Sequence, residues 1–169
     1  WNARTGAPYQ VMHGHFDWIR SIAFSADSRF LASAAEDGKI MLWDVETGSI
    51  SKSIEGRMPR VFTVAFCVNE EYLAAGGADR AVQLFSVENG EHIASLSGHK
   101  GWLTSVVAFG PTRLASCSED GTIRIWDLEQ RECLTELVVG NKVWCGAFSG
   151  QGQSFLSGSD DGILRQWNL

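Results

Sequence analysis

Two stretches of the chain carry a histidine, a serine and an aspartate at nearly the same spacing. These residues are His15, Ser33 and Asp37 in the first stretch, and His99, Ser116 and Asp120 in the second. Such residue types form the nucleophilic triad of many hydrolases. Neither serine, however, lies in the Gly-x-Ser-x-Gly motif that exposes such a nucleophile on a sharp turn. Hydrolysis by these residues is therefore not expected, and their role depends on the elements that position them.

The chain is built from a repeating unit of 41 or 42 residues. The clearest landmark is an aromatic residue that ends an alternating segment, and its copies are Trp1, Trp43, Phe85, Trp126 and Trp167. An Ala-Phe pair, a Leu-Ala or Leu-Ser segment and an Asp-Gly turn recur in phase with it. Self-similarity at this period predicts a repeat architecture. We therefore divide residues 1–169 into repeats of approximately 2–43, 44–85, 86–126 and 127–167.

Each repeat is expected to contain four short strands. In the first unit they cover roughly residues 8–13, 18–24, 29–35 and 39–45, and Asp-Gly between the last two predicts a hairpin. No window has a sustained helical period, so we expect about fifteen strands and almost no helix. A small sheet with apolar residues on both faces must stack on neighbouring sheets to bury them.

This phased pattern resembles the WD-repeat family over essentially the whole chain. Gly-His pairs open units at residues 14–15 and 98–99, and Trp-Asp pairs close them at 43–44 and 126–127. The resemblance implies an all-β fold, a β-propeller of four-stranded antiparallel blades. About four WD repeats would then form part of a larger ring.

The resemblance also implies a structural role for the polar residues. In the family, a histidine, a serine or threonine, an aspartate and a tryptophan often form one hydrogen-bonded chain within a blade. By position this network comprises His15, Ser33, Asp37 and Trp43 in the first unit, and His99, Ser116, Asp120 and Trp126 in the third. The serine hydroxyl would then be occupied by the indole donor.

The second and fourth units depart from this pattern. The fourth keeps Ser157, Asp161 and Trp167, but its opening is shortened and carries Gly-Asn in place of Gly-His. The second keeps only Asp79, and Arg57, Ala75 and Phe85 occupy the other positions. These two blades are expected to rely more on apolar packing.

Partners in the family often bind the face formed by the loops before the first strand and by the hairpin turns. The candidate residues on that face are Trp18, Trp102, Glu36, Glu119, Arg60 and Lys142. Aromatic anchors among charged groups would suit a peptide that carries Lys or Arg. The alternative is that both indoles pack against neighbouring blades.

Composition disfavours several other functions. The net charge is −6 and no basic stripe is present, so nucleic acid is not an expected partner. The longest apolar run is too short to cross a membrane. Four cysteines without zinc-ligand spacing predict buried thiols in a reducing compartment, with no metal or cofactor. We expect a cytoplasmic or otherwise intracellular protein.

The leading functional hypothesis is a non-catalytic scaffold or adaptor that binds a protein or peptide through the propeller loop face. The alternative is a sensor or repeat region of a larger signalling protein, with an effector domain outside this chain. An enzyme with its site in the central channel is disfavoured, because the first strands offer mainly apolar residues. For the ring, we favour further blades in a longer chain over a homodimer with eight blades or a four-blade ring.

Overall fold

The computed structural model describes residues 2–55, 57–67, 70–150 and 152–169, so the repeat landmark Trp1 lies outside the described residues. Fifteen β-strands form four antiparallel sheets in these ranges, and the same ranges contain no helix. Accordingly, no described helix is long and apolar enough to span a membrane. The all-β fold of propeller blades predicted from the sequence is confirmed.

Three of the sheets have four strands in chain order. The first contains β1 (Ile19–Phe24), β2 (Phe30–Ala35), β3 (Ile40–Asp44) and β4 (Ile50–Ile54). The second contains β5 (Val61–Phe66), β6 (Tyr72–Gly77), β7 (Ala81–Ser86) and β8 (His92–Ser97). The third contains β9 (Leu103–Phe109), β10 (Arg113–Ser118), β11 (Thr122–Asp127) and β12 (Glu132–Val138). The fourth has three strands, β13 (Val143–Phe148), β14 (Ser154–Ser159) and β15 (Leu164–Asn168).

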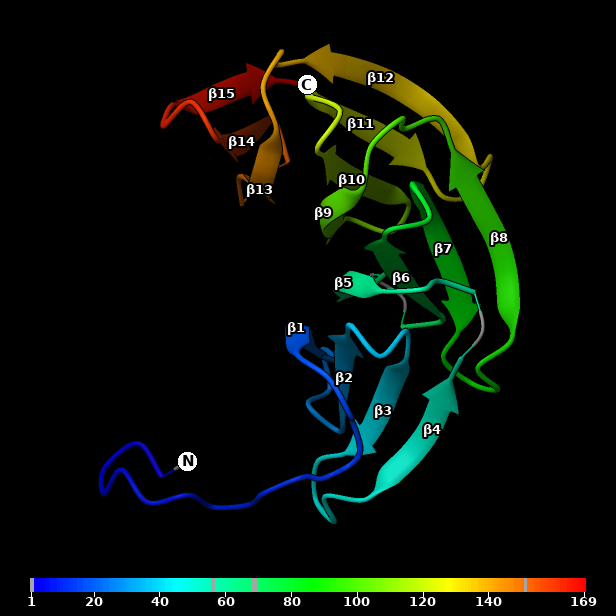
Figure 1. The fold of residues 1–169 in the computed structure, drawn as a ribbon, viewed down its shortest axis with the longest axis vertical. Coiled ribbons are helices and arrows are strands. Elements are labelled where there is room, and N and C mark those ends of the chain that lie inside the picture. The colour runs from blue at the N-terminus through cyan, green and yellow to red at the C-terminus, as the bar shows by residue number, and fades with distance from the viewer. Residues whose placement is uncertain (1, 56, 68–69, 151) are drawn as a thin grey trace.

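The four sheets stand side by side around an arc (Figure 1). Strands β1, β5, β9 and β13 line its inner side and contact one another in that order, while β4, β8 and β12 lie outside. Three hydrophobic clusters fill the three boundaries between successive sheets. Leu42 packs with Phe85 at the first boundary, Leu84 with Trp126 at the second, and Ile125 with Phe155 at the third. The second and third sheets are thus covered on both faces, as the apolar residues on those faces require. The first and fourth sheets are covered on one face only, and Ile22 and Leu164 are 61% and 76% exposed on them.

The hairpin turn between the second and third strands of each blade needs one residue with positive φ. Gly38 and Gly121 provide it in the first and third blades, with φ of 78° and 82°. Arg80 takes the same place in the second blade with φ of 67°, a conformation that is unfavourable for a residue with a side chain. The departure from Asp-Gly therefore changes the residue but keeps the turn.

Two expectations from the sequence are wrong. Residues 8–13 form no strand, because a strand needs a hydrogen-bonded neighbour and no described segment pairs with them. Figure 1 shows this N-terminal segment leading away from the arc. The expectation of buried thiols holds for Cys67 and Cys117, whereas Cys133 and Cys145 are exposed. Cys133 lies on the outer strand β12, which is exposed at all but one position, and Cys145 lies in an exposed part of β13.

Candidate interaction face

Two blades contain a continuous chain of hydrogen-bonded side chains. In the third blade, the indole Nε1 of Trp126 donates to Ser116 Oγ at 2.8 Å, and Ser116 Oγ lies 2.7 Å from His99 Nε2. His99 Nδ1 lies 3.0 Å from Asp120 Oδ2. These bonds connect the loop that carries His99, the hairpin turn that carries Asp120, and the strands β10 and β11.

The first blade repeats this chain with nearly the same geometry. Trp43 donates to Ser33 at 2.8 Å, Ser33 lies 2.6 Å from His15 Nε2, and His15 Nδ1 lies 2.9 Å from Asp37. The structure therefore brings together all four residues that the family resemblance grouped in each of these two blades.

The direction of the hydrogen bonds follows from the indole, which can only donate. Ser116 accepts from Trp126, so its own hydroxyl hydrogen donates to His99 Nε2. Nδ1 then carries the imidazole hydrogen and donates to Asp120. A neutral imidazole fits this arrangement, and burial lowers the pKa of His99 although Asp120 opposes that effect.

Asp120, in the hairpin turn, accepts three hydrogen bonds besides the one from His99. The Lys100 amide donates to Oδ2 at 2.7 Å, and the Thr122 amide and hydroxyl donate to Oδ1 at 2.9 and 2.7 Å. Burial alone would raise the pKa of Asp120, but these bonds and His99 outweigh it and lower the pKa to about 2. Asp120 is thus a carboxylate whose charge is stabilised by the turn.

This geometry does not suit the two serines for nucleophilic catalysis. Ser33 and Ser116 are both buried, and each hydroxyl is engaged by an indole on one side and an imidazole on the other. A substrate carbonyl would have no access to either oxygen.

The fourth blade keeps only part of the chain. Trp167 donates to Ser157 at 2.9 Å, as in the complete blades. Asp161 accepts from Arg165 and Ser159 in its own hairpin, with Arg165 Nη2 at 2.6 Å and Ser159 Oγ at 2.6 Å. Asn141, which replaces the histidine at the opening of the blade, donates to Asp161 Oδ2 at 3.0 Å. The Arg165 guanidinium is the main reason that the pKa of Asp161 lies well below its usual range.

The second blade has a different polar network, which the sequence comparison missed. Gln83 on β7 donates to Asp79 at 2.6 Å, and its side-chain oxygen lies 2.8 Å from His92 Nε2 and 2.6 Å from Ser95 Oγ. Asp79 Oδ1 is buried without a partner among the described residues, and burial raises the pKa of this carboxyl. The sequence did contain a signal for this network, because Gln83 is a polar residue between the apolar residues Val82 and Leu84 of β7.

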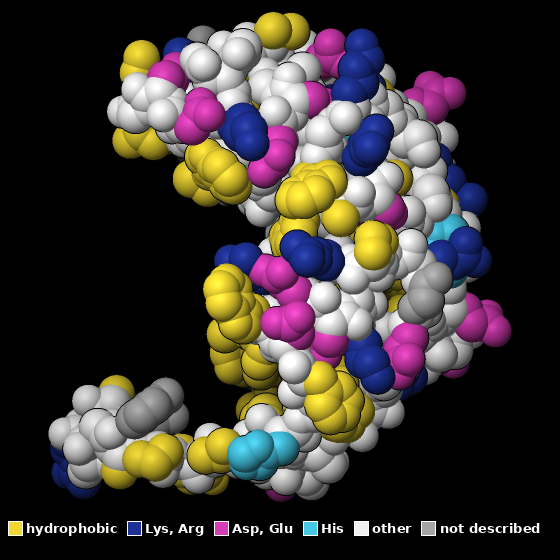
Figure 2. All heavy atoms as spheres, viewed as in Figure 1, with side chains coloured by type: hydrophobic (Ala, Val, Ile, Leu, Met, Phe, Trp, Pro, Cys, Tyr) yellow, Lys and Arg dark blue, Asp and Glu magenta, His cyan; other side chains and the backbone are white. Residues whose placement is uncertain are grey.

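The two indoles singled out for binding lie at the surface. Trp18 is 69% exposed and Trp102 is 41% exposed, so neither is buried between blades. Figure 2 shows hydrophobic side chains interleaved with basic and acidic ones along the inner side of the arc. A role of these indoles in binding stays a prediction.

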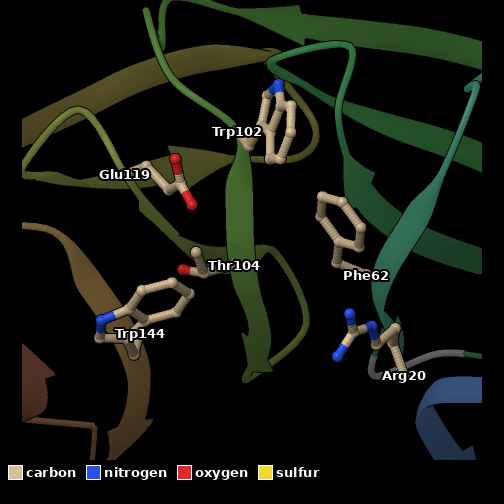
Figure 3. Close-up of a pocket in the computed structure, with 6 residues that line it drawn as sticks. All are labelled: Arg20, Phe62, Trp102, Thr104, Glu119 and Trp144. Atoms are coloured by element: carbon tan, nitrogen blue, oxygen red, sulfur yellow. The ribbon is translucent and has the colours of Figure 1, made fainter. Parts of the chain in front are cut away.

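A hollow of about 340 Å³ opens beside Trp102 on this face. It is lined by Arg20, Phe62, Trp102, Thr104, Glu119 and Trp144, which come mainly from the inner strands (Figure 3). Phe62 and Trp102 form a tilted aromatic pair with ring centroids 5.7 Å apart.

Phe62 and Trp144 were missed by the sequence analysis. They share one position in the inner strands with Arg20 and Thr104, two residues after the position of Trp18 and Trp102. Comparison of the repeats at that position would have grouped them, because alternate residues of a strand point to one side.

The charged candidates form ion pairs that cross blade boundaries. Glu36 of the first blade accepts from Arg20 at 2.6 Å and lies 3.5 Å from Arg60, which precedes the second blade. Glu119 of the third blade pairs at 3.1 Å with Lys142, which precedes the fourth. Both acidic groups predicted to receive a basic ligand are therefore already paired within the chain.

Comparison with known proteins agrees with this geometry. The family model described as WD domain, G-beta repeat matches residues 6–44, 48–86, 90–127 and 131–168. Among curated proteins, the nuclear distribution proteins PAC1-2 of Uncinocarpus reesii and PAC1 of Coccidioides posadasii are 31% and 32% identical to this chain over its whole length. Apoptotic protease-activating factor 1 of Rattus norvegicus is 31% identical over 92% of the chain.

The chain spans only part of each of these relatives. It covers 33% and 32% of the two nuclear distribution proteins and 12% of the apoptotic factor. The similarity therefore concerns the repeat array and not the complete relatives.

Proposed function

The chain belongs to the WD-repeat family, and on that premise we propose that it is a non-catalytic scaffold or adaptor that binds a protein partner through the loop face. The observation that carries this proposal is the exposed aromatic hollow beside Trp102. Exposed aromatic side chains in a concave site are typical anchors of protein interfaces.

The hollow also indicates the chemistry of the partner's anchor. Glu36 and Glu119 are already in ion pairs, so they offer little net charge to a lysine or arginine. The rings of Phe62 and Trp102 provide the free contact area, and a hydrophobic or aromatic side chain of the partner would pack on them. The surrounding ion pairs would then form the polar rim of the interface.

The proposal is tested by comparing partners captured by the wild-type protein with those captured by Trp102→Ala. The matched control is Leu134→Ala, which removes an exposed hydrophobic side chain from the outer strand β12. We expect at least one partner, quantified by mass spectrometry and then purified, to bind Trp102→Ala about tenfold more weakly than wild type. Equal binding by wild type, Trp102→Ala and Leu134→Ala, with all three folded, would refute the role of this face.

A second candidate is a repeat region of a larger signalling protein. It is favoured by the similarity to apoptotic protease-activating factor 1, of which this chain covers 12%. The complete coding sequence around these repeats tests it, since an adjoining effector domain is required.

A further inference from the structure

The opposite face of the array carries a second groove, between the second and third blades. It is formed by the turns that follow the first and third strands of these blades, at the other end of the strands from Trp102 and Glu119. It consists of two adjacent hollows of about 200 Å³ and 440 Å³, which share the lining residues Glu71, Tyr72 and Ile93.

The base of the groove is apolar. Leu84 and Leu128 are buried beneath it, and partly exposed Tyr72 and Ile93 line both hollows. Pro111 forms an exposed wall on the side of the third blade. A side chain with a long hydrocarbon stem could therefore cover apolar surface here.

The rim of the groove is acidic. Its charged lining residues are Glu70, Glu71, Glu88, Glu129 and Arg131. Glu70 accepts hydrogen bonds from the backbone amides of Ala26 and Asp27 in the first blade. Glu71, Glu88 and Glu129 are exposed, and none of them forms an ion pair with another described residue.

This charge distribution differs from that of the loop face. There, Glu36 and Glu119 are each paired with a basic side chain of the adjacent blade. The groove is lined by four carboxylates and one guanidinium, and none of these carboxylates has a basic partner among the described residues. Carboxylates beside a partly exposed tyrosine and an apolar floor match a basic side chain in both charge and shape.

We propose that this groove binds a basic, extended segment of a second protein partner. A lysine or arginine of that segment would lay its stem over Tyr72 and Ile93 and direct its charge to Glu71 and Glu88. The array would then hold two proteins at once, one on each face, which goes beyond binding through the loop face alone.

The sharpest test reverses one rim charge and compares it with a matched site. Glu88 and Glu46 occupy the same position of the same turn in the second and first blades, and Glu46 lines neither hollow. The probe is a short fluorescein-labelled peptide in which lysine alternates with threonine, and glutamate replaces lysine in its twin. Binding to the 169-residue chain is measured by fluorescence anisotropy at low and high salt.

We expect saturable binding of the lysine peptide that weakens with salt, and none of the glutamate twin. Glu88→Lys should weaken binding about fivefold, and Glu71→Lys/Glu88→Lys about tenfold or more, whereas Glu46→Lys has little effect. Glu88→Gln should cause a smaller loss in the same direction, and circular dichroism checks the fold of each variant. Trp102→Ala should leave binding of this probe unchanged, which separates the groove from the loop face.

Three outcomes would overturn the proposal. One is the absence of saturable binding to the wild-type chain. The second is an equal loss for Glu46→Lys and Glu88→Lys, which would show that only the net charge matters. The third is self-association by light scattering that Glu88→Lys abolishes, because a second copy of the chain would then occupy the groove.

Discussion

Replacement of Asp120 by alanine should destabilise the chain far more than replacement of Asp79, although both aspartates occupy the same turn position. Asp120 accepts four hydrogen bonds, from His99, from the Lys100 amide and from the amide and hydroxyl of Thr122. Without it, the buried imidazole of His99 loses the acceptor of its Nδ1 hydrogen. Asp79 accepts only one side-chain bond, from Gln83, and its other oxygen has no partner among the described residues.

The magnitude can be obtained in two ways that agree. The side chain of Asp120 is 11% exposed and its pKa falls from 3.8 to about 2, which corresponds to about 2 kcal/mol in favour of the folded state at neutral pH. A buried donor left without its acceptor costs about 1–3 kcal/mol. The Thr122 hydroxyl lies 3.1 Å from His99 Nδ1 and could replace part of that bond. We therefore expect about 2 kcal/mol for Asp120→Ala.

For Asp79→Ala the expected loss is below about 1 kcal/mol. Burial raises the pKa of Asp79, so its charged form is disfavoured in the folded chain and little stabilisation is lost with it. The free energy of unfolding is measured by urea titration followed through tryptophan fluorescence, with exposed Asp160→Ala as the surface control. Equal losses for Asp120→Ala and Asp79→Ala would refute the different roles assigned to the two turns.

Two further predictions concern the same framework. Stability should fall on acidification in two windows, and urea titrations across pH measure it. The first window lies below pH 6.5, because burial lowers the pKa of His99 and the unfolded chain therefore binds a proton more readily than the folded chain. The second window lies between pH 3.8 and about 2, where Asp120 becomes protonated in the unfolded chain before it does so in the folded chain. Stability that is unchanged from pH 8 to about pH 5 would contradict the first window. Gly77→Ala should lower the melting temperature, because a methyl group there would overlap the carbonyl oxygen of Arg60. Gly150→Ala is the control, because a methyl group there meets no atom within 4 Å and Gly150 has no positive φ. Equal melting temperatures for the two variants would contradict the close approach.

Much of the fold could be predicted because the period of the sequence and the spacing within each blade are local properties. Strand length, hairpin turns and the alternation of apolar residues are set by residues close together in the chain, and the four sheets follow them. The serine and tryptophan of a blade lie ten residues apart on paired strands, so their register alone brings them together, even in the fourth blade. The roles of the histidine and the aspartate in the first and third blades were predicted from the resemblance to the WD-repeat family.

The local prediction fails where a residue has a choice of partners. The sequence places Asp161 at the same position as Asp120, but its blade opens with Asn141 in place of a histidine, and Asp161 accepts from both Asn141 and Arg165. Gln83 fills the polar centre of the second blade in a similar way, with His92 and Ser95 from the outer strand. Neither change belongs to the repeat pattern, so the hydrogen-bond partners of each could be assigned only from the positions of the side chains in space.

Contacts between blades were decided by the tertiary structure alone. The pairs Glu36 with Arg60 and Glu119 with Lys142 join residues of successive repeats, 24 and 23 positions apart. The repeat places both pairs at equivalent positions, but only the packing of one blade on the next shows that their side chains meet. The acidic groove combines turns from two repeats, so its charge and shape exist only when both blades are packed. The sequence by itself determined the blades and their internal hydrogen bonds, since these depend on strand register over short distances. The packing angle and spacing between blades determined which surface residues come together, because they place side chains of different repeats beside one another.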